Sequence, residues 1–282
     1  TVGLVERAVE PELQATGTAL SEPVTPVSIT VGGCMIRIDA FPIGTHADLI
    51  RSTVQKPDNL ARVAHIRREM SGQTTIVSIG RVDYAKGTRE MLLAFERLLA
   101  RRPELHGKVR LLVTAVAAAD GMRAYKKAQQ SIEQLVGRIN GHIGTLSWQP
   151  ILLSTTPMPF ADTLCYYRAA DICWITPLRD GLNLVAKEFI AAHVNESGVL
   201  VLSEFAGAAV ELQDAVLVNP YSLVQMDAAI DRALDMPREE QRARMQRMDA
   251  LMDRYDIGHW TGHVLALFEQ LRLQPADNRA AA

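Results

Sequence analysis

The sequence has few cysteines, no excess of either charge and no long apolar run, and each absence argues against a class of protein. Among its 282 residues, 30 lysines and arginines balance 32 aspartates and glutamates, so we expect no nucleic-acid partner. No apolar run approaches the roughly 20 residues of a membrane-spanning helix, and the start lacks a signal-peptide pattern. Cys34, Cys165 and Cys173 are odd in number and widely spaced, which favours reduced thiols over disulfides. We therefore expect a cytoplasmic protein with no membrane partner.

From residue 74 onward, segments with strand and helix patterns alternate. The predicted strands are residues 76–79, 109–115, 150–153, 172–175 and 199–202, and the helices between them are residues 88–99, 124–139, 161–169 and a segment from 184. Such alternation predicts an α/β fold with a doubly wound parallel sheet. Helices at 223–234, 237–255 and 259–273 follow, and residues 274–282 are expected to be a disordered tail.

The first 45 residues differ from the rest. Residues 27–30 and 35–41 are β-like runs on either side of Gly32 and Gly33, which predicts a hairpin whose strands have no sheet of their own. A polar connection and a helix at 59–70 are expected before the alternating region begins.

The stretch from Asp171 to Ala192 is the most informative part of the chain. An apolar strand runs directly into the polar loop 176–183, in which Gly181 permits a positive φ, and a helix begins at about Leu184. Open α/β sheets bind ligands at the carboxyl ends of their strands, and a helix N-terminus there favours an anion such as a diphosphate. Alternatively, Asp180 and Asn183 merely cap the helix.

A second polar loop follows the first strand of the alternating region. Its cations, Arg81 and Lys86, can straddle a diphosphate and stabilise the charge that grows on it as a bond to a sugar breaks. Alternatively, both are solvated charges, and Asp83 pairs with either of them. The loop matches neither G-x-x-x-x-G-K-[ST] nor G-x-G-x-x-G, so a nicotinamide-dependent oxidoreductase is disfavoured.

Two further patterns carry less weight. His259 and His263 stand four residues apart on a predicted helix, but Trp260 occupies the position where a zinc protease needs glutamate, so no metal site is expected. The small residues at 205–209 open a predicted helix after the last strand. They permit either close approach of a ligand to the backbone or tight helix packing.

The motifs GRVDYAKG at 80–87, TPLRDGLNLVAKE at 176–188 and VLSEFAGAA at 201–209 resemble those of the trehalose-6-phosphate synthases and their close relatives. Within that group the chain is most similar to the glucosylglycerol-phosphate synthases. Leu182 replaces the usual methionine of the trehalose enzymes, and Ala119 replaces one of their phosphate-binding arginines. The similarity covers about residues 41–271.

The resemblance implies a B-type glycosyltransferase with two Rossmann-like domains and no cofactor. It would transfer glucose with retention from ADP-glucose to glycerol 3-phosphate. By the same resemblance, Arg81 and Lys86 would bind the donor diphosphate, Asp180 would accept hydrogen bonds from glucose hydroxyls, and Glu188 would hold the ribose. The backbone N–H groups of Gly181, Leu182, Asn183, Leu184 and Val185 would face the glucose and the phosphates.

The family's N-terminal domain is represented only by its last segment. Residues 1–45 are expected to be a remnant of this acceptor-side domain, and residues 46–273 the Rossmann-like donor domain with a closing helix at 259–273. The apolar face of that helix would be exposed or would form a homo-oligomer contact. We expect weak donor binding and little turnover.

Three alternatives stay open. One is trehalose-6-phosphate synthesis from glucose 6-phosphate, which Ala119 and Leu182 disfavour. Another is a non-catalytic nucleotide-sugar-binding module. The choice between ADP and UDP is also open.

Overall fold

The computed structural model describes residues 13–14, 27–31, 34–38, 41–117, 123–193 and 196–273. These residues form two compact units, and each is described by itself. One unit is Thr45–Arg254, and the other joins the residues up to Gly44 with those from Tyr255 onward. Ala119 and the predicted tail at 274–282 lie outside the described residues.

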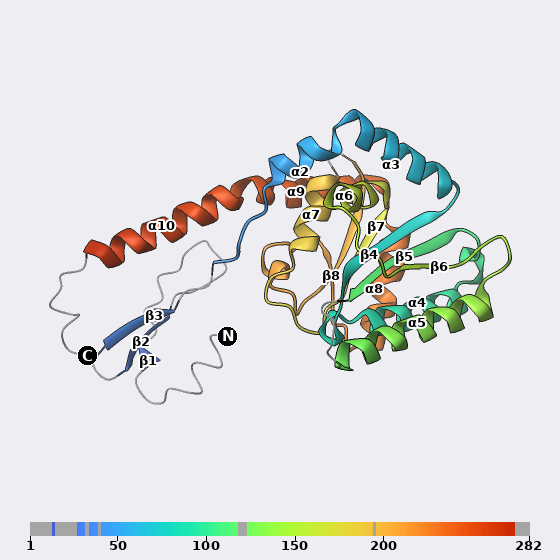
Figure 1. The fold of residues 1–282 in the computed structure, drawn as a ribbon, viewed down its shortest axis with the longest axis horizontal. Helices are drawn as coiled ribbons and strands as arrows, with labels where there is room; N and C mark the ends of the chain where they lie inside the picture. Colours follow the sequence, from blue (N-terminus) through green and yellow to red (C-terminus); the bar gives the residue numbers. More distant parts are fainter. Residues whose placement is uncertain are drawn as a thin grey trace. The chain divides into compact units, whose positions relative to one another are not determined.

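The larger unit is built on a six-stranded sheet in the order β6-β5-β4-β7-β8-β9 (Figure 1). Its strands are β4 (Thr74–Val82), β5 (Val109–Ala117), β6 (Ile151–Ser154), β7 (Ile172–Ile175), β8 (Val199–Ser203) and β9 (Val216–Val218). Every pairing in this sheet is parallel. The predicted doubly wound α/β fold is therefore confirmed, and the strand order reverses between β4 and β7.

Helices cover both faces of this sheet (Figure 1). One face carries α4 (Thr88–Arg101), α5 (Arg123–Ile143) and α8 (Leu223–Asp235). The other carries α2 (Ala47–Val54), α6 (Phe160–Ala169), α7 (Leu184–Ala192) and α9 (Arg238–Arg254), while α3 (Pro57–Glu69) packs on α6. Successive strand residues alternate between the two cores, so Ile76 joins the first core and Val77 the second. Strands buried on both faces explain the continuous apolar runs in the sequence.

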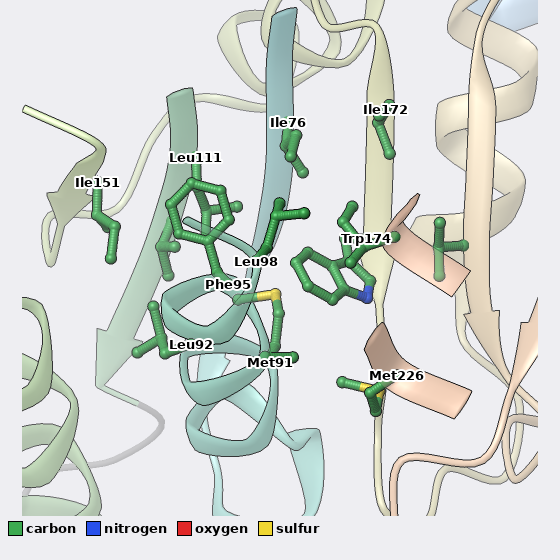
Figure 2. Close-up of a cluster of buried hydrophobic side chains, with 14 of the residues drawn as sticks. Ile76, Met91, Leu92, Phe95, Leu98, Leu111, Ile151, Ile172, Trp174 and Met226 are labelled. Carbon is green, nitrogen blue, oxygen red and sulfur yellow. The ribbon is translucent and has the colours of Figure 1, made fainter. Parts of the chain in front are cut away.

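The first core is densest where α4 lies against the sheet (Figure 2). Phe95, Leu92 and Leu98 of α4 are fully buried and share this core with Ile76 and Trp174 of the strands. Burying one such side chain contributes roughly 1.5–3 kcal/mol. This packing holds β4 and β7, whose carboxyl ends carry the two polar loops, in a rigid frame.

Helix α2 and strand β9 of the larger unit were missed from the sequence. Helix α2 was expected to be a polar connection, and the three-residue strand β9 was not expected. The other predicted helices and strands are present, with ends displaced by one to several residues, except that the helix expected to open at 205–209 is only the 3₁₀ helix η3 (Gly207–Val210).

The smaller unit contains β1 (Leu13–Gln14), β2 (Val27–Val31), β3 (Cys34–Ile38) and α10 (Ile257–Leu273). Strands β2 and β3 form the predicted hairpin, but they also pair with β1 in a three-stranded sheet, so the expectation that they lack a sheet was wrong. On α10, the His263 ring lies 4.7 Å from the Phe41 ring, measured between centroids. No described helix is both long enough and apolar enough to cross a membrane.

Candidate functional site

A cavity of about 440 Å³ opens at the carboxyl ends of β4 and β7, where the strand order reverses. Gly80, Arg81 and Lys86 line it from the β4 side, and Asn183, Val185 and Glu188 line it from the β7 side. Crevices at such a reversal are the usual ligand sites of open α/β sheets, because the loops on its two sides diverge toward opposite faces. The two polar stretches singled out in the sequence therefore meet in one cavity.

The first side of the cavity is cationic. Strand β4 continues to Val82, so Arg81 lies on the strand itself, where its side chain is exposed. Lys86 ends the short 3₁₀ helix η1 (Tyr84–Lys86), which Asp83 caps by accepting a hydrogen bond from the Ala85 N–H at 2.9 Å. The expected alternative that Asp83 pairs with one of the cations is therefore not what the structure shows.

Lys86 forms an ion pair with Asp180 of the loop after β7. Its Nζ lies 2.7 Å from Asp180 Oδ2, and the Asn183 side-chain amide donates to the same oxygen at 3.1 Å. Asp180 therefore does not cap α7; it links the two loops. Because the Asp180 side chain is only 14% exposed, this charge pair is screened less than a surface pair would be.

Asn183 caps α7. Its Oδ1 accepts a hydrogen bond from the Ala186 N–H at 3.0 Å, and its backbone has a φ of 76°. The positive φ was expected at Gly181, but among the described residues of this loop only Asn183 has one. A side-chain amide that caps the helix start is compatible with this left-handed conformation. The N-terminal end of the α7 dipole, which favours anions, consequently lies at the cavity.

Glu188 lies one turn into α7 and lines the same cavity. Burial raises the pKa of its carboxyl group above the usual value. Tyr167 of α6, whose pKa burial raises strongly, also lines the cavity and is only 1% exposed. This part of the site is less polar than the Lys86 side, which suits the sugar and base of a nucleotide better than its phosphates.

Backbone contacts hold the two loops together. Gly87 has a φ of +66°, and a Cβ built on it would lie 1.9 Å from the Thr176 carbonyl oxygen. Next to this contact, the Leu178 N–H donates to the Ala85 carbonyl at 2.7 Å. A glycine is thus required at position 87 for both its conformation and its space.

The family model of glycosyltransferase family 20 matches residues 16–270. The chain belongs to glycosyltransferase family 20. It is 53% identical over 249 residues to glucosylglycerol-phosphate synthase of Synechocystis sp., covering 88% of this chain and 50% of that protein. The protein of the same name from Picosynechococcus sp. is 55% identical over 230 residues, which are 82% of this chain and 46% of that one. The family 20 chain thus spans about half the length of these relatives.

Solved structures of family 20 have the same fold. An α,α-trehalose-phosphate synthase (UDP-forming) from Burkholderia xenovorans in complex with glucose-6-phosphate superposes with a TM-score of 0.85 at 35% identity, over 92% of this chain and 56% of that chain. A structure from E. coli, named for trehalose-6-phosphate and bound with UDP-2-fluoro glucose, has a TM-score of 0.85 at 34% identity, over 95% and 58% of the two chains. These likenesses support the expected Rossmann-like B-type half.

The sequence-based site residues of this family 20 member divide into two groups. Arg81, Lys86, Asn183, Val185 and Glu188 line the cavity. Asp180, Gly181, Leu182 and Leu184 do not line it; Asp180 lies behind Lys86, and Gly181 and Leu184 are exposed.

Further lining residues were missed. They come from the carboxyl end of β5, the segment after β6 and helix α6, and include Thr114, Val116, Thr156, Met158 and Tyr167. Their signal was the predicted parallel sheet itself, because parallel strands end at the same edge of the sheet. Within the described ranges, no group of three or more His, Cys, Asp and Glu residues is arranged to hold a metal ion.

Proposed function

We propose that this chain is the donor-binding half of a glucosyltransferase that transfers glucose, with retention of configuration, from ADP-glucose to glycerol 3-phosphate. The cavity carries the proposal, because it joins Arg81 and Lys86 on the β4 side with the α7 N-terminus and Glu188 on the β7 side. Cations and a helix N-terminus suit a diphosphate, and a carboxylate suits the hydroxyls of a ribose. The two glucosylglycerol-phosphate synthases that are more than 50% identical support the transfer of glucose to a glycerol phosphate, whereas the choice of ADP rests on the family resemblance alone.

The residues act by electrostatic stabilisation in this proposal. When the bond between the sugar carbon and the diphosphate oxygen breaks, negative charge accumulates on the departing diphosphate. The Lys86 ammonium, the Arg81 guanidinium and the α7 N-terminus lie at the cavity where that charge develops, so they lower the barrier. Asp180 does not line the cavity but holds Lys86 Nζ at 2.7 Å; its role as an acceptor for glucose hydroxyls in this proposal rests on the family resemblance.

Trehalose-6-phosphate synthesis is the second candidate, because solved family structures with a TM-score of 0.85 carry that name. Its named relatives are less similar in sequence; the one from Sodalis glossinidius is 40% identical over 227 residues. We therefore place glycerol 3-phosphate first as the acceptor. Because the chain spans about half the length of the relatives, we propose that by itself it binds the donor and turns over little.

Calorimetric titration of ADP, UDP and ADP-glucose into the purified chain tests donor binding. We expect saturable ADP binding, and Lys86→Met should weaken it about tenfold to a hundredfold, because a charge-assisted hydrogen bond contributes roughly 1.5–3 kcal/mol. Lys108→Met is the matched control, since Lys108 is exposed and immediately precedes the amino end of β5, at the opposite edge of the sheet.

The outcomes separate the candidates. Equal ADP affinity in the wild type and Lys86→Met would refute the assigned role of Lys86, and UDP binding in preference to ADP would favour the trehalose alternative. Absence of any nucleotide binding would refute the donor-binding function. Efficient glucose transfer by this chain alone would refute the proposal that it turns over little.

A further inference from the structure

The polar loop after β7 is held from behind by backbone atoms of residues 205–208. The Asp180 N–H donates to the Phe205 carbonyl at 3.1 Å, and the Gly207 N–H donates back to the Asp180 carbonyl at 3.0 Å. The Ala208 N–H donates to the Leu182 carbonyl at 2.7 Å. Asp180 and Ala206 form a parallel bridge, so this part of the loop is paired as a strand would be. The loop after β7 is therefore hydrogen-bonded to residues 205–208 through its backbone.

This attachment leaves no space for a side chain at Gly207. A Cβ built there would lie 2.2 Å from the Gly181 carbonyl oxygen and 2.8 Å from the Gly181 carbonyl carbon. The φ of Gly207 is not positive, so space alone demands a glycine at this position. A Cβ built on Gly181 itself would meet nothing within 4 Å. Of the two alternatives for the small residues at 205–209, the structure supports tight packing, and it shows that the packing partner is the site loop.

A buried ion pair attaches the start of α7 to the same segment. Lys187 Nζ lies 2.7 Å from Glu211 Oε2, and the two side chains are 0% and 4% exposed. Glu211 directly follows the 3₁₀ helix η3 (Gly207–Val210), and Lys187 lies in the first turn of α7. Buried charges at this distance interact strongly and fix the two side chains relative to each other. Both the loop and the helix start are thus bound to residues 206–211.

We propose that Gly207 is a positioning residue for donor binding, with the Lys187–Glu211 pair as its partner. In this inference, which rests on the proposed function, the residue touches no substrate. It lets the loop 180–182 lie against residues 205–208, and this contact sets where the α7 N-terminus meets the diphosphate. A methyl group at position 207 pushes the Gly181 carbonyl outward and moves the backbone N–H groups away from the phosphates. The nucleoside part of the cavity, next to Tyr167 and Glu188, is unaffected.

The test compares two ligands that differ by one phosphate. Calorimetry gives the dissociation constants of AMP and ADP, or of UMP and UDP if uridine nucleotides bind, for the wild type and for Gly207→Ala. A variant that is only less stable loses affinity for both ligands by the same factor. A displaced loop lowers the affinity for ADP about tenfold more than the affinity for AMP, because a charge-assisted contact to the second phosphate is lost. Gly137→Ala in α5 is the matched control, since a Cβ built there meets nothing within 4 Å.

Amide hydrogen exchange of the ligand-free chain supplies an independent readout. The N–H groups of Asp180, Gly207 and Ala208 make the three connecting hydrogen bonds, so we expect all three to exchange faster in Gly207→Ala and at the wild-type rate in Gly137→Ala. If Gly207→Ala does not fold, Glu211→Gln takes its place, with the same expected shift in the AMP-to-ADP ratio.

The outcomes are distinct. An unchanged AMP-to-ADP ratio would overturn the positioning role, whatever the loss of total affinity. If the wild type binds no nucleotide, the proposed function fails. Amide hydrogen exchange then tests by itself whether Gly207 sets the position of the loop. Unchanged exchange at the three amides would overturn the placement as well.

Discussion

Replacing Gly87 by alanine should destabilise the chain far more than the same change at other glycines with a positive φ. Gly87, Gly72 and Gly107 have φ values of +66°, +79° and +78°, so an alanine at any of them meets similar backbone strain. Around Gly72 and Gly107 a Cβ meets nothing within 4 Å, whereas at Gly87 it would lie 1.9 Å from the Thr176 carbonyl oxygen. Comparing alanine variants at the three positions therefore separates the effect of backbone strain from that of the steric contact at Gly87.

The magnitude follows from the two contributions. A left-handed alanine costs roughly 1–2 kcal/mol, and the reduced entropy of the unfolded chain returns roughly 0.4–1 kcal/mol. Gly72→Ala and Gly107→Ala should therefore lower the free energy of unfolding by about 1 kcal/mol or less. At Gly87 the loops must also separate and give up the hydrogen bond from the Leu178 N–H to the Ala85 carbonyl. The contact and the lost bond bring the total to about 3 kcal/mol.

Thermal unfolding followed by circular dichroism measures the difference. For a unit of this size, 1 kcal/mol shifts Tm by roughly 2–4 °C, so Gly87→Ala should lower Tm by about 6–12 °C and Gly107→Ala by about 4 °C or less. ADP affinity should fall in Gly87→Ala alone, because the separated loops carry Lys86 and Asp180. A Tm for Gly87→Ala equal to that of Gly107→Ala would refute the reasoning, since strain would then account for the whole effect.

Two further predictions concern pH and the buried titratable groups of α7. Burial raises the pKa of Glu188, so the folded chain favours the protonated carboxyl group. The free energy of unfolding therefore decreases as pH rises through that raised pKa. Glu188→Gln should therefore gain in Tm over the wild type between pH 4 and pH 8 while it binds ADP about tenfold more weakly; a constant Tm difference across that range would contradict the raised pKa. Burial lowers the pKa of His193 from 6.5 to about 4, so the folded chain favours the neutral ring. This contribution to the free energy of unfolding is complete above pH 6.5, and about 3 kcal/mol of it is lost as pH falls through pH 4. In urea denaturation, the free energy of unfolding of His193→Gln should decrease less over this pH range than that of the wild type. An equal decrease in both proteins would disprove the lowered pKa of His193.

The arrangement of strands and helices was predictable because each strand is buried on both faces. Residues 172–175 form an apolar run with no exposed position, and β8 follows the same pattern, whereas β4 is buried at its centre and ends near the exposed Arg81. Helix α2 escaped notice because only Ala47, Ile50 and Val54 of its eight residues are buried, which is too short a pattern to stand out from a polar linker. Strand β9 has three residues, fewer than a periodicity needs.

The site was predictable to the level of its loops but not of its contacts. Arg81 and Lys86 were identified because polar residues directly followed a predicted strand, and Glu188 was identified through the family resemblance. The partner of Lys86 was not identified, because Asp83 is near in sequence while Asp180 is near only after the sheet has formed. The positive φ at Asn183 was likewise assigned to Gly181, since local propensity favours glycine and the capping hydrogen bond to the Ala186 N–H decides otherwise.

The pairing of β4 with β7 divides the sheet into halves that are each continuous in the chain. Only two residue pairs, Ile76 with Ile172 and Val77 with Cys173, join these strands, whereas nine pairs join β4 to β5. Strands β4, β5 and β6 precede residue 155, and β7, β8 and β9 follow residue 171. A cut between β6 and α6 would therefore give two fragments that share few strand pairs, although α3 packs on α6 and α4 on α8 across the cut, and the cavity draws residues from both. The fold thus offers a division for a split reporter, in which the proposed nucleotide-sugar donor would bring the fragments together.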